Sequence, residues 1–172
     1  MNIMGLDLSL TSTGVSVNEE TSIVSTKFKA AQRLSVMTQQ IIDIVKTNKI
    51  KCVIIEGYSF ASRNSQAHSI GELGGCVRMR LHEAGISYVE VPPKCRAKFA
   101  TGKGNASKGE VISAISAKTG IIFSGASGND ECDAWVLEQM AFAKLGLSKW
   151  SWNKEQLSAL DSIDWAPLTD TE

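Results

Sequence analysis

The sequence predicts an α/β protein with one mixed, five-stranded β-sheet flanked by helices. Residues 3–28 contain three short segments of alternating apolar residues separated by turn formers, which is typical of an antiparallel meander. In residues 51–56, KCVIIE, the segment CVII is apolar and largely β-branched, which indicates a buried parallel strand. Helical spacing recurs between and after these strands. With 172 residues, 43% of them hydrophobic, the chain can bury the core of a single domain.

The predicted meander carries one acidic residue in an otherwise apolar strand. Its first strand covers residues 3–8, its second begins at Gly14, and its third covers residues 21–28 after an Asn18-Glu19-Glu20 turn. Asp7 lies within the first strand. Because an unpaired buried carboxylate is costly to desolvate, Asp7 is expected at a sheet end, or beside a partner or a cation.

Five helices and one further strand complete the predicted fold. The helices are expected at residues 30–47, 64–84, 94–100, 109–118 and 130–144, and the strand at residues 87–91. Ser107 and Glu110 have the spacing of a capping box before the fourth helix. The second helix contains Gly71, Gly74 and Gly75, and each interior glycine costs about 1 kcal/mol relative to alanine. Another helix or another subunit is therefore expected to approach this backbone closely.

The charge of the chain is unevenly distributed. Formal net charge is zero, but residues 155–172 carry five acids and no Lys or Arg, which leaves 18 bases against 13 acids in residues 1–154. The stretch from Lys94 to Lys108 contains five bases and no acid. A basic body with an acidic tail is typical of a protein that binds a polyanion, and a solvated basic loop is the alternative interpretation.

Other features narrow the class of protein. The four cysteines are widely spaced and form no CxxC pair, which argues against a zinc site and a disulfide framework. No apolar run is long enough for a membrane span, and the N-terminus has no basic leader. The sequence therefore predicts a cytoplasmic protein with no membrane partner.

Four carboxylates stand out by position. Asp7 lies in the first strand, Glu56 ends the central strand, and Asp130 and Asp133 lie three residues apart at the start of the last helix. If these elements are neighbours, the acids converge and need hard divalent ions such as Mg²⁺ or Mn²⁺. Two such ions about 4 Å apart can catalyse in-line displacement at a phosphodiester.

Each acid also has a purely structural interpretation. Asp7 can be a buried acid bonded to backbone amides, and Glu56 can be an ordinary residue at a strand end. Asp130 and Asp133 suit the N-terminal dipole of any helix. All four pointing to one site makes the joint structural interpretation weaker than any single one.

Four segments together carry a resemblance to a known family. GLDLSLTSTGVSV, VIIEGYSFASRN, KGNASKGEV and NDECDAW, in this order and spacing, resemble the RuvC family of Holliday-junction resolvases in the ribonuclease H-like superfamily. The resemblance implies a ribonuclease H-like fold and identifies Asp7, Glu56, Asp130 and Asp133 as Mg²⁺-binding catalytic carboxylates, with Mn²⁺ as an alternative ion. It also implies that Lys108, with Lys103 as the alternative, faces the scissile phosphate.

The resemblance further implies an activity, a partner and a subunit arrangement. It points to a homodimeric crossover junction endodeoxyribonuclease that nicks four-way junctions in pairs and leaves 5′-phosphate and 3′-hydroxyl ends, with forks and three-way junctions as further substrates. Tyr58 or Phe60 would insert at the junction centre, and the glycine-rich helix would dimerise. The expected phosphate contacts are Arg63, Arg78, Arg80, Lys94, Arg96, Lys98, Lys103 and Lys108. The nuclease domain would cover residues 1–147, and residues 148–172 would form a tryptophan-containing acidic tail.

The chain departs from the usual family pattern in its first strand and its tail. Leu8-Ser9 stands where the family has proline and glycine, and the acidic tail extends past the resemblance. These departures resemble small bacteriophage members, which would act in the cytoplasm of a bacterial host. Two alternatives stay open: a catalytically silent relative that only binds branched nucleic acid, and an actin-like phosphate-binding domain suggested by GLDLSLTSTG.

Overall fold

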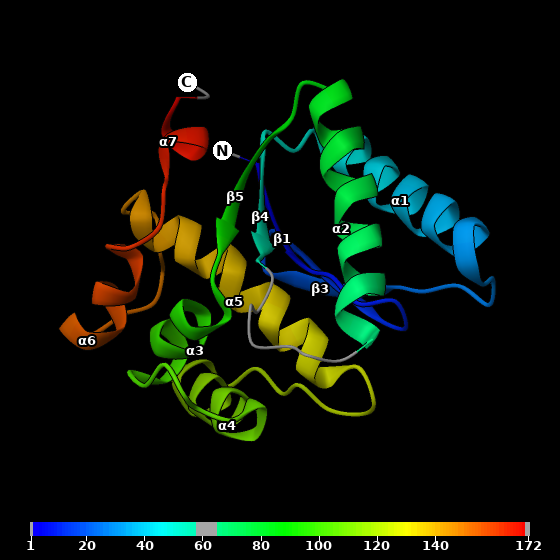
Figure 1. Ribbon diagram of the computed structural model, residues 1–172. Helices are drawn as coiled ribbons and strands as arrows, with labels where there is room; N and C mark the ends of the chain where they lie inside the picture. The colour runs from blue at the N-terminus through cyan, green and yellow to red at the C-terminus, as the bar shows by residue number, and fades with distance from the viewer. Residues whose placement is uncertain (1, 58–64, 171–172) are drawn as a thin grey trace.

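The structure is built on one five-stranded mixed sheet with the order β3-β2-β1-β4-β5 (Figure 1). This computed structural model describes residues 2–57 and 65–170, with the backbone alone over residues 65–70. The strands are β1 (Ile3–Asp7), β2 (Thr13–Val17), β3 (Glu20–Val24), β4 (Cys52–Glu56) and β5 (Ser87–Val91). The first three pair antiparallel, and β4 is parallel to both β1 and β5. The predicted combination of a meander with parallel strands is confirmed.

Helices cover both faces of the sheet. α1 (Ala30–Thr47) and α2 (Ser65–Glu83) lie on one face, and α5 (Gly128–Lys144) crosses the other (Figure 1). α3 (Pro93–Thr101) and α4 (Lys108–Thr119) pack beside α5. None of the helices in the described part of the chain is long and apolar enough to cross a membrane.

Alternation along the strands supplies two cores. In β4, Val53 and Ile55 join the core under α1 and α2, whereas Cys52 and Ile54 join the core under α3 and α5. Because side chains of a strand point alternately to its two faces, a strand covered on both sides must be apolar throughout. This explains the unbroken apolar run that the sequence shows before Glu56.

Two glycines allow α5 to lie directly on β1 and β2. A Cβ atom at Gly5 would stand 2.0 Å from the Ala134 carbonyl oxygen, and one at Gly14 would stand 2.0 Å from the Asp130 carbonyl oxygen. Any side chain at either position would collide with helix backbone, which cannot move aside without moving the helix. The sheet therefore accepts α5 at this distance only with glycine at both positions.

The C-terminal segment packs on the body of the protein. It contains α6 (Lys154–Leu157), a 3₁₀ turn (Ser158–Leu160) and α7 (Ala166–Thr169). The Gln156 side chain donates a hydrogen bond to the Ala100 carbonyl at 3.0 Å, and the Trp152 ring lies 4.2 Å from the Phe99 ring, centroid to centroid. Residues beyond 147 thus complete the core against α3.

The third strand is shorter than predicted. Residues 21–28 were expected to be extended, but β3 ends at Val24, opposite Thr13. Thr13 begins β2, and its hydroxyl donates to the Ser9 carbonyl at 2.7 Å, which turns the preceding chain away. Beyond Val24 the edge strand has no partner to pair with.

The structure also tests the predicted turn, the predicted capping box and the close approach expected at α2. Asn18 and Glu19 adopt positive φ angles of 54° and 68° in the predicted turn, and Ser107 and Glu110 form the predicted capping box. A Cβ atom at Gly75 would meet no described atom within 4 Å, so no described part of this chain makes the expected close approach at this glycine.

Replacing Gly14 with alanine tests the contact between α5 and the sheet. We expect Gly14→Ala to lower the free energy of unfolding by about 3 kcal/mol or more, because the new methyl group collides with the Asp130 carbonyl. Gly109→Ala is the control, since a Cβ atom there meets open space. Urea unfolding measures both, and equal stability of the two variants would contradict the described packing.

Candidate active site

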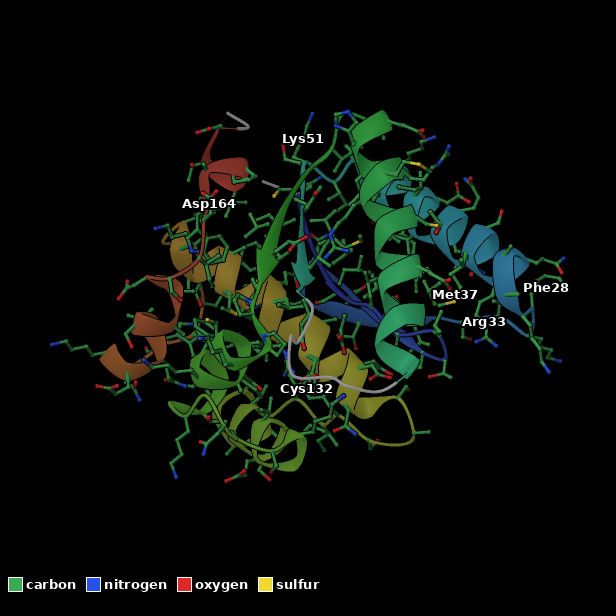
Figure 2. All side chains as sticks on the ribbon, viewed as in Figure 1. Phe28, Arg33, Met37, Lys51, Cys132 and Asp164 are labelled. Carbon is green, nitrogen blue, oxygen red and sulfur yellow. The ribbon has the colours of Figure 1, made fainter. Side chains whose placement is uncertain are left out.

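Two of the singled-out acids lie side by side where parallel strands end. β1 and β4 pair in parallel with Leu6 opposite Ile55, so Asp7 and Glu56, one residue further on, end their strands at the same edge. In Figure 2, Cys132 of α5 lies toward this end of the sheet and Lys51, just before β4, lies toward the other. The carboxyl edge of the sheet is where functional groups gather in open α/β folds.

The first turns of α5 bring the other two acids to this edge. The carboxylate of Asp133 is buried and that of Asp130 is partly exposed, and both face Lys108. The two other acids of the helix serve its attachment: Glu131 accepts hydrogen bonds from Thr21 and Ser127, each at 2.9 Å. Asp130 and Asp133 are thus the acids of α5 whose described partners are cations.

Glu138, one helical turn further along α5, is fully buried and ties the helix to the meander. It accepts a hydrogen bond from the Ser16 hydroxyl at 2.6 Å and another from the Glu19 backbone N–H at 3.1 Å. Burial raises the pKa of Glu138, and these hydrogen bonds oppose the rise. This carboxylate therefore attaches α5 to the meander and is not one of the four acids singled out in the sequence.

Two basic side chains link the acids into one cluster. Arg96 of α3 forms ion pairs with Glu56 through Nε and with Asp133 through Nη1. Lys108, at the start of α4, lies 3.6 Å from Asp133 Oδ2 and 3.8 Å from Asp130 Oδ1, measured from Nζ. The acid cluster, defined as Asp7, Glu56, Asp130 and Asp133, therefore contains two cations of the chain itself.

The electrostatics show how closely these groups interact. Burial raises the pKa of Asp7 well above its usual value, and the charges of Glu56 and Asp133 raise it further. Burial likewise raises the pKa of Asp133 to about 6, against the opposing effect of Arg96. Burial works to lower the pKa of Arg96, but its acidic neighbours outweigh this and the pKa rises. The cluster holds more negative charge than its two cations neutralise.

The residues expected to contact phosphate differ in their exposure and in their ion-pair partners. Arg96 is not on the surface: its side chain is 7% exposed and is enclosed by the acid cluster. Arg78 and Arg80 form ion pairs with Glu90 and Glu83. Lys94, Lys103 and Lys108 are exposed, and Lys98 is partly so. Tyr58, Phe60 and Arg63 lie outside the described residues.

The helical spacing around Arg96 indicates that it is buried, although the basic run suggests an exposed residue. Phe99 and Ala100 follow it at i+3 and i+4, so all three share one face of α3, and that face is buried. A basic run is usually solvated, and this led to the surface interpretation. The helical spacing carries the better information.

The donor chemistry of the cluster fits a hard divalent cation. Its potential ligands are carboxylate oxygens, and the buried Oδ2 of Asp133 accepts no hydrogen bond from the residues that the structure describes. Yet within residues 2–57 and 71–170 no three acidic, histidine or cysteine side chains are already grouped to hold a metal ion. The Arg96 guanidinium pairs with both Glu56 and Asp133 at this position.

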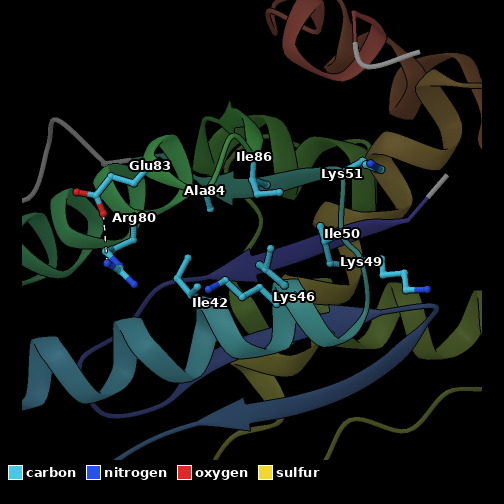
Figure 3. Close-up of a pocket in the computed structure, with 10 residues that line it drawn as sticks. Ile42, Lys46, Lys49, Ile50, Lys51, Arg80, Glu83, Ala84 and Ile86 are labelled. Carbon is cyan, nitrogen blue, oxygen red and sulfur yellow. Dashed lines mark hydrogen bonds and ion pairs between the residues drawn. The ribbon is translucent and has the colours of Figure 1, made fainter.

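A second basic region lies at the far end of the sheet. Lys46, Lys49 and Lys51 surround a hollow of about 380 Å³ between α1 and the end of α2 (Figure 3). Arg80 on its rim pairs with Glu83 at 3.2 Å. The floor is apolar, with Ile42 among its residues, and the described lining contains the carboxylate of Glu83 but none of the four acids at the carboxyl edge.

The sheet order and its helices define a ribonuclease H-like fold. Comparison with solved structures finds Thermus thermophilus RuvC in complex with a Holliday-junction substrate, 21% identical with a TM-score of 0.67, covering 88% of this chain and 99% of that one. A second Thermus thermophilus RuvC structure is 20% identical with a TM-score of 0.65, covering 88% of this chain and 100% of that one. The yeast mitochondrial Holliday-junction resolvase Ydc2 is 12% identical with a TM-score of 0.55, covering 79% and 75%. No protein-family model and no curated protein matches the chain.

The raised pKa of Asp133 predicts that the stability of the folded protein depends on pH. Because this pKa is about 6 in the folded protein and near 3.8 ordinarily, the folded state binds the proton more tightly, and stability falls as pH rises between these values. Asp133→Asn carries no such charge. Without divalent ions, the free energy of unfolding of Asp133→Asn relative to that of the wild type should therefore rise with pH across this range. The total rise should be about 1–3 kcal/mol at neutral pH.

Urea unfolding in EDTA at several pH values measures this difference. Asp161→Asn, which removes an exposed carboxylate elsewhere, is the control and should show no comparable trend. A constant difference between Asp133→Asn and the wild type at all pH values would contradict the described electrostatics.

Proposed function

We propose that this protein is a divalent-metal-dependent, structure-selective DNA endonuclease that cuts branched DNA. The observation that carries the proposal is the convergence of Asp7, Glu56, Asp130 and Asp133, from β1, β4 and α5, at the carboxyl edge of a ribonuclease H-like sheet. In a protein that only binds phosphate, a cluster of carboxylates would weaken binding, because negative charges repel the phosphate. The similarity of the fold to junction resolvases supports branched DNA as the substrate class.

The acid cluster would hold Mg²⁺, or Mn²⁺, which when bound would activate water for attack on phosphorus and stabilise charge on the leaving oxygen. Asp7, whose pKa is raised by the charges of Glu56 and Asp133, would contribute to metal binding together with both, and Glu56 would orient the attacking water. Asp130, at the outer side of the cluster, would complete the site. In-line attack of water on phosphorus, from the side opposite the 3′-oxygen, would break the P–O3′ bond and leave 5′-phosphate and 3′-hydroxyl ends.

Lys108 is suited to act on the substrate phosphate. Its side chain is 57% exposed, yet its ammonium group lies within 4 Å of two acids of the cluster. A fixed positive charge at this position stabilises the negative charge that builds on the phosphoryl oxygens during attack. Exposed lysines of the same stretch, Lys94 and Lys103, would supply sequence-independent contacts to the DNA backbone.

A homodimer suits a branched substrate with two-fold symmetry, because an isologous interface repeats the active site across the axis. The groove between α1 and α2 is a candidate interface. Leu34 and Met79 line it, Met79 is 54% exposed, and Gly75 nearby leaves room for close approach.

The bacteriophage origin receives no support from the comparisons and stays a prediction.

Cleavage of a labelled four-way junction in Mg²⁺ tests the proposal. The wild type should nick opposing strands in pairs, and Asp7→Asn should reduce the rate by about 10³-fold or more, because it removes a metal ligand. Equal cleavage by both proteins would end the nuclease assignment. Junction binding by both with cleavage by neither would favour a silent DNA-binding relative, and nucleotide hydrolysis would favour the actin-like alternative.

Lys108→Ala separates cutting from binding. We expect it to slow single-turnover cleavage by about 10²-fold, because it removes a charge beside the reacting phosphoryl group, and to change junction affinity only a few-fold. Lys154→Ala removes an exposed lysine of the C-terminal segment and should alter neither quantity. Loss of affinity without loss of the saturated cleavage rate would overturn the role given to Lys108.

A further inference from the structure

Arg96 occupies an unusual place for an arginine. Its side chain is 7% exposed, and the residues on either side of it, Cys95 and Ala97, are buried as well. The guanidinium uses Nε toward Glu56 and Nη1 toward Asp133, so one cation bridges the end of β4 and the second turn of α5. Since arginine stays protonated at every accessible pH, this positive charge is permanent.

The bridge has a consequence for any divalent ion in the cluster. A Mg²⁺ or Mn²⁺ ion that binds both Glu56 and Asp133 must lie about 2.1 Å from an oxygen of each. The guanidinium already lies between these two carboxylates and takes one oxygen of each. Even beside it, a doubly charged ion would be repelled at short range in a buried, weakly screened site.

Lys108 does not impose the same restriction. Its ammonium group lies 3.6 and 3.8 Å from the nearest carboxylate oxygens, and its side chain is 57% exposed. It can move outward into solvent. Arg96 must instead give up two ion pairs, although the 17% exposure of Glu56 shows that the outer side of this arrangement reaches water.

We propose that Arg96 is a built-in counter-cation that competes with the divalent metal for Glu56 and Asp133. Without metal it neutralises the two acids and joins α3 to the sheet and to α5. When an ion binds both acids, the guanidinium leaves them. This inference rests on the proposed function, because it assigns to Arg96 a control over metal loading of that same site.

Calorimetric titration of the full chain with Mn²⁺ at neutral pH tests the competition. Arg96→Gln should bind Mn²⁺ about tenfold or more tightly than the wild type, because a repelling charge is gone. In EDTA the same variant should melt at a lower temperature, and Mn²⁺ should raise that temperature more than in the wild type. Arg96→Lys keeps the charge and should stay close to the wild type, as should the control Arg33→Gln on α1.

The outcomes distinguish the inference from the proposed function. Unchanged or weaker Mn²⁺ affinity in Arg96→Gln would overturn the competition and leave the nuclease assignment standing. Absence of Mn²⁺ binding in every protein, including the wild type, would overturn both. If Arg96→Gln does not fold, the arginine Nε–H resonance of wild-type Arg96, assigned by its absence in Arg96→Lys, gives the answer. It should shift on saturation with Mg²⁺, and an unmoved signal would refute the competition.

Discussion

The direct contact of α5 with β1 and β2 is the constraint on which the rest of the structure depends. Gly5 and Gly14 let the helix backbone reach the sheet, so the first turns of α5 lie beside the end of β1. Hydrogen bonds from Thr21 to Glu131 and from Ser16 to Glu138 then attach the helix to the meander. A helix held further away would leave its acids too distant to interact with Asp7.

This packing produces a buried concentration of negative charge that needs cations. The chain supplies two of different kinds. Arg96 is enclosed and spans Glu56 and Asp133, whereas Lys108 is exposed and lies near Asp130 and Asp133. Burial of a lone carboxylate is costly, and even with both cations present the pKa of Asp133 is raised to about 6. The remaining imbalance of charge supports the proposal that the cluster binds a divalent ion.

Much of the fold follows from local patterns in the sequence. The capping box at Ser107, the apolar run before Glu56 and the helical spacing over residues 30–47 each depend on neighbours in the chain, and each prediction is confirmed. The meeting of Asp7 and Glu56 is predicted only on the condition that their strands are neighbours, and the observed sheet order meets that condition. The local features could be predicted because the physics that decides them acts within a few residues.

The features that escaped prediction depend on distant parts of the chain. The end of β3 is decided by where β2 begins, and the close approach at Gly5 and Gly14 depends on a helix more than a hundred residues away. Arg96 lies in a basic stretch that suggests a solvated surface, and only its acidic partners from β4 and α5 make its burial tolerable. Such long-range pairing leaves little trace in local composition.

The four acids, from distant parts of the chain, are proposed to form one metal-binding centre at the carboxyl edge of the sheet. Anomalous diffraction from crystals soaked in Mn²⁺ is the decisive test of this centre. We expect an anomalous peak within coordination distance of Asp7 and at least one of Glu56 and Asp133, with the Arg96 guanidinium displaced from its present position. Well-ordered crystals that show Arg96 still bridging Glu56 and Asp133, with Mn²⁺ bound only elsewhere, would contradict the claim.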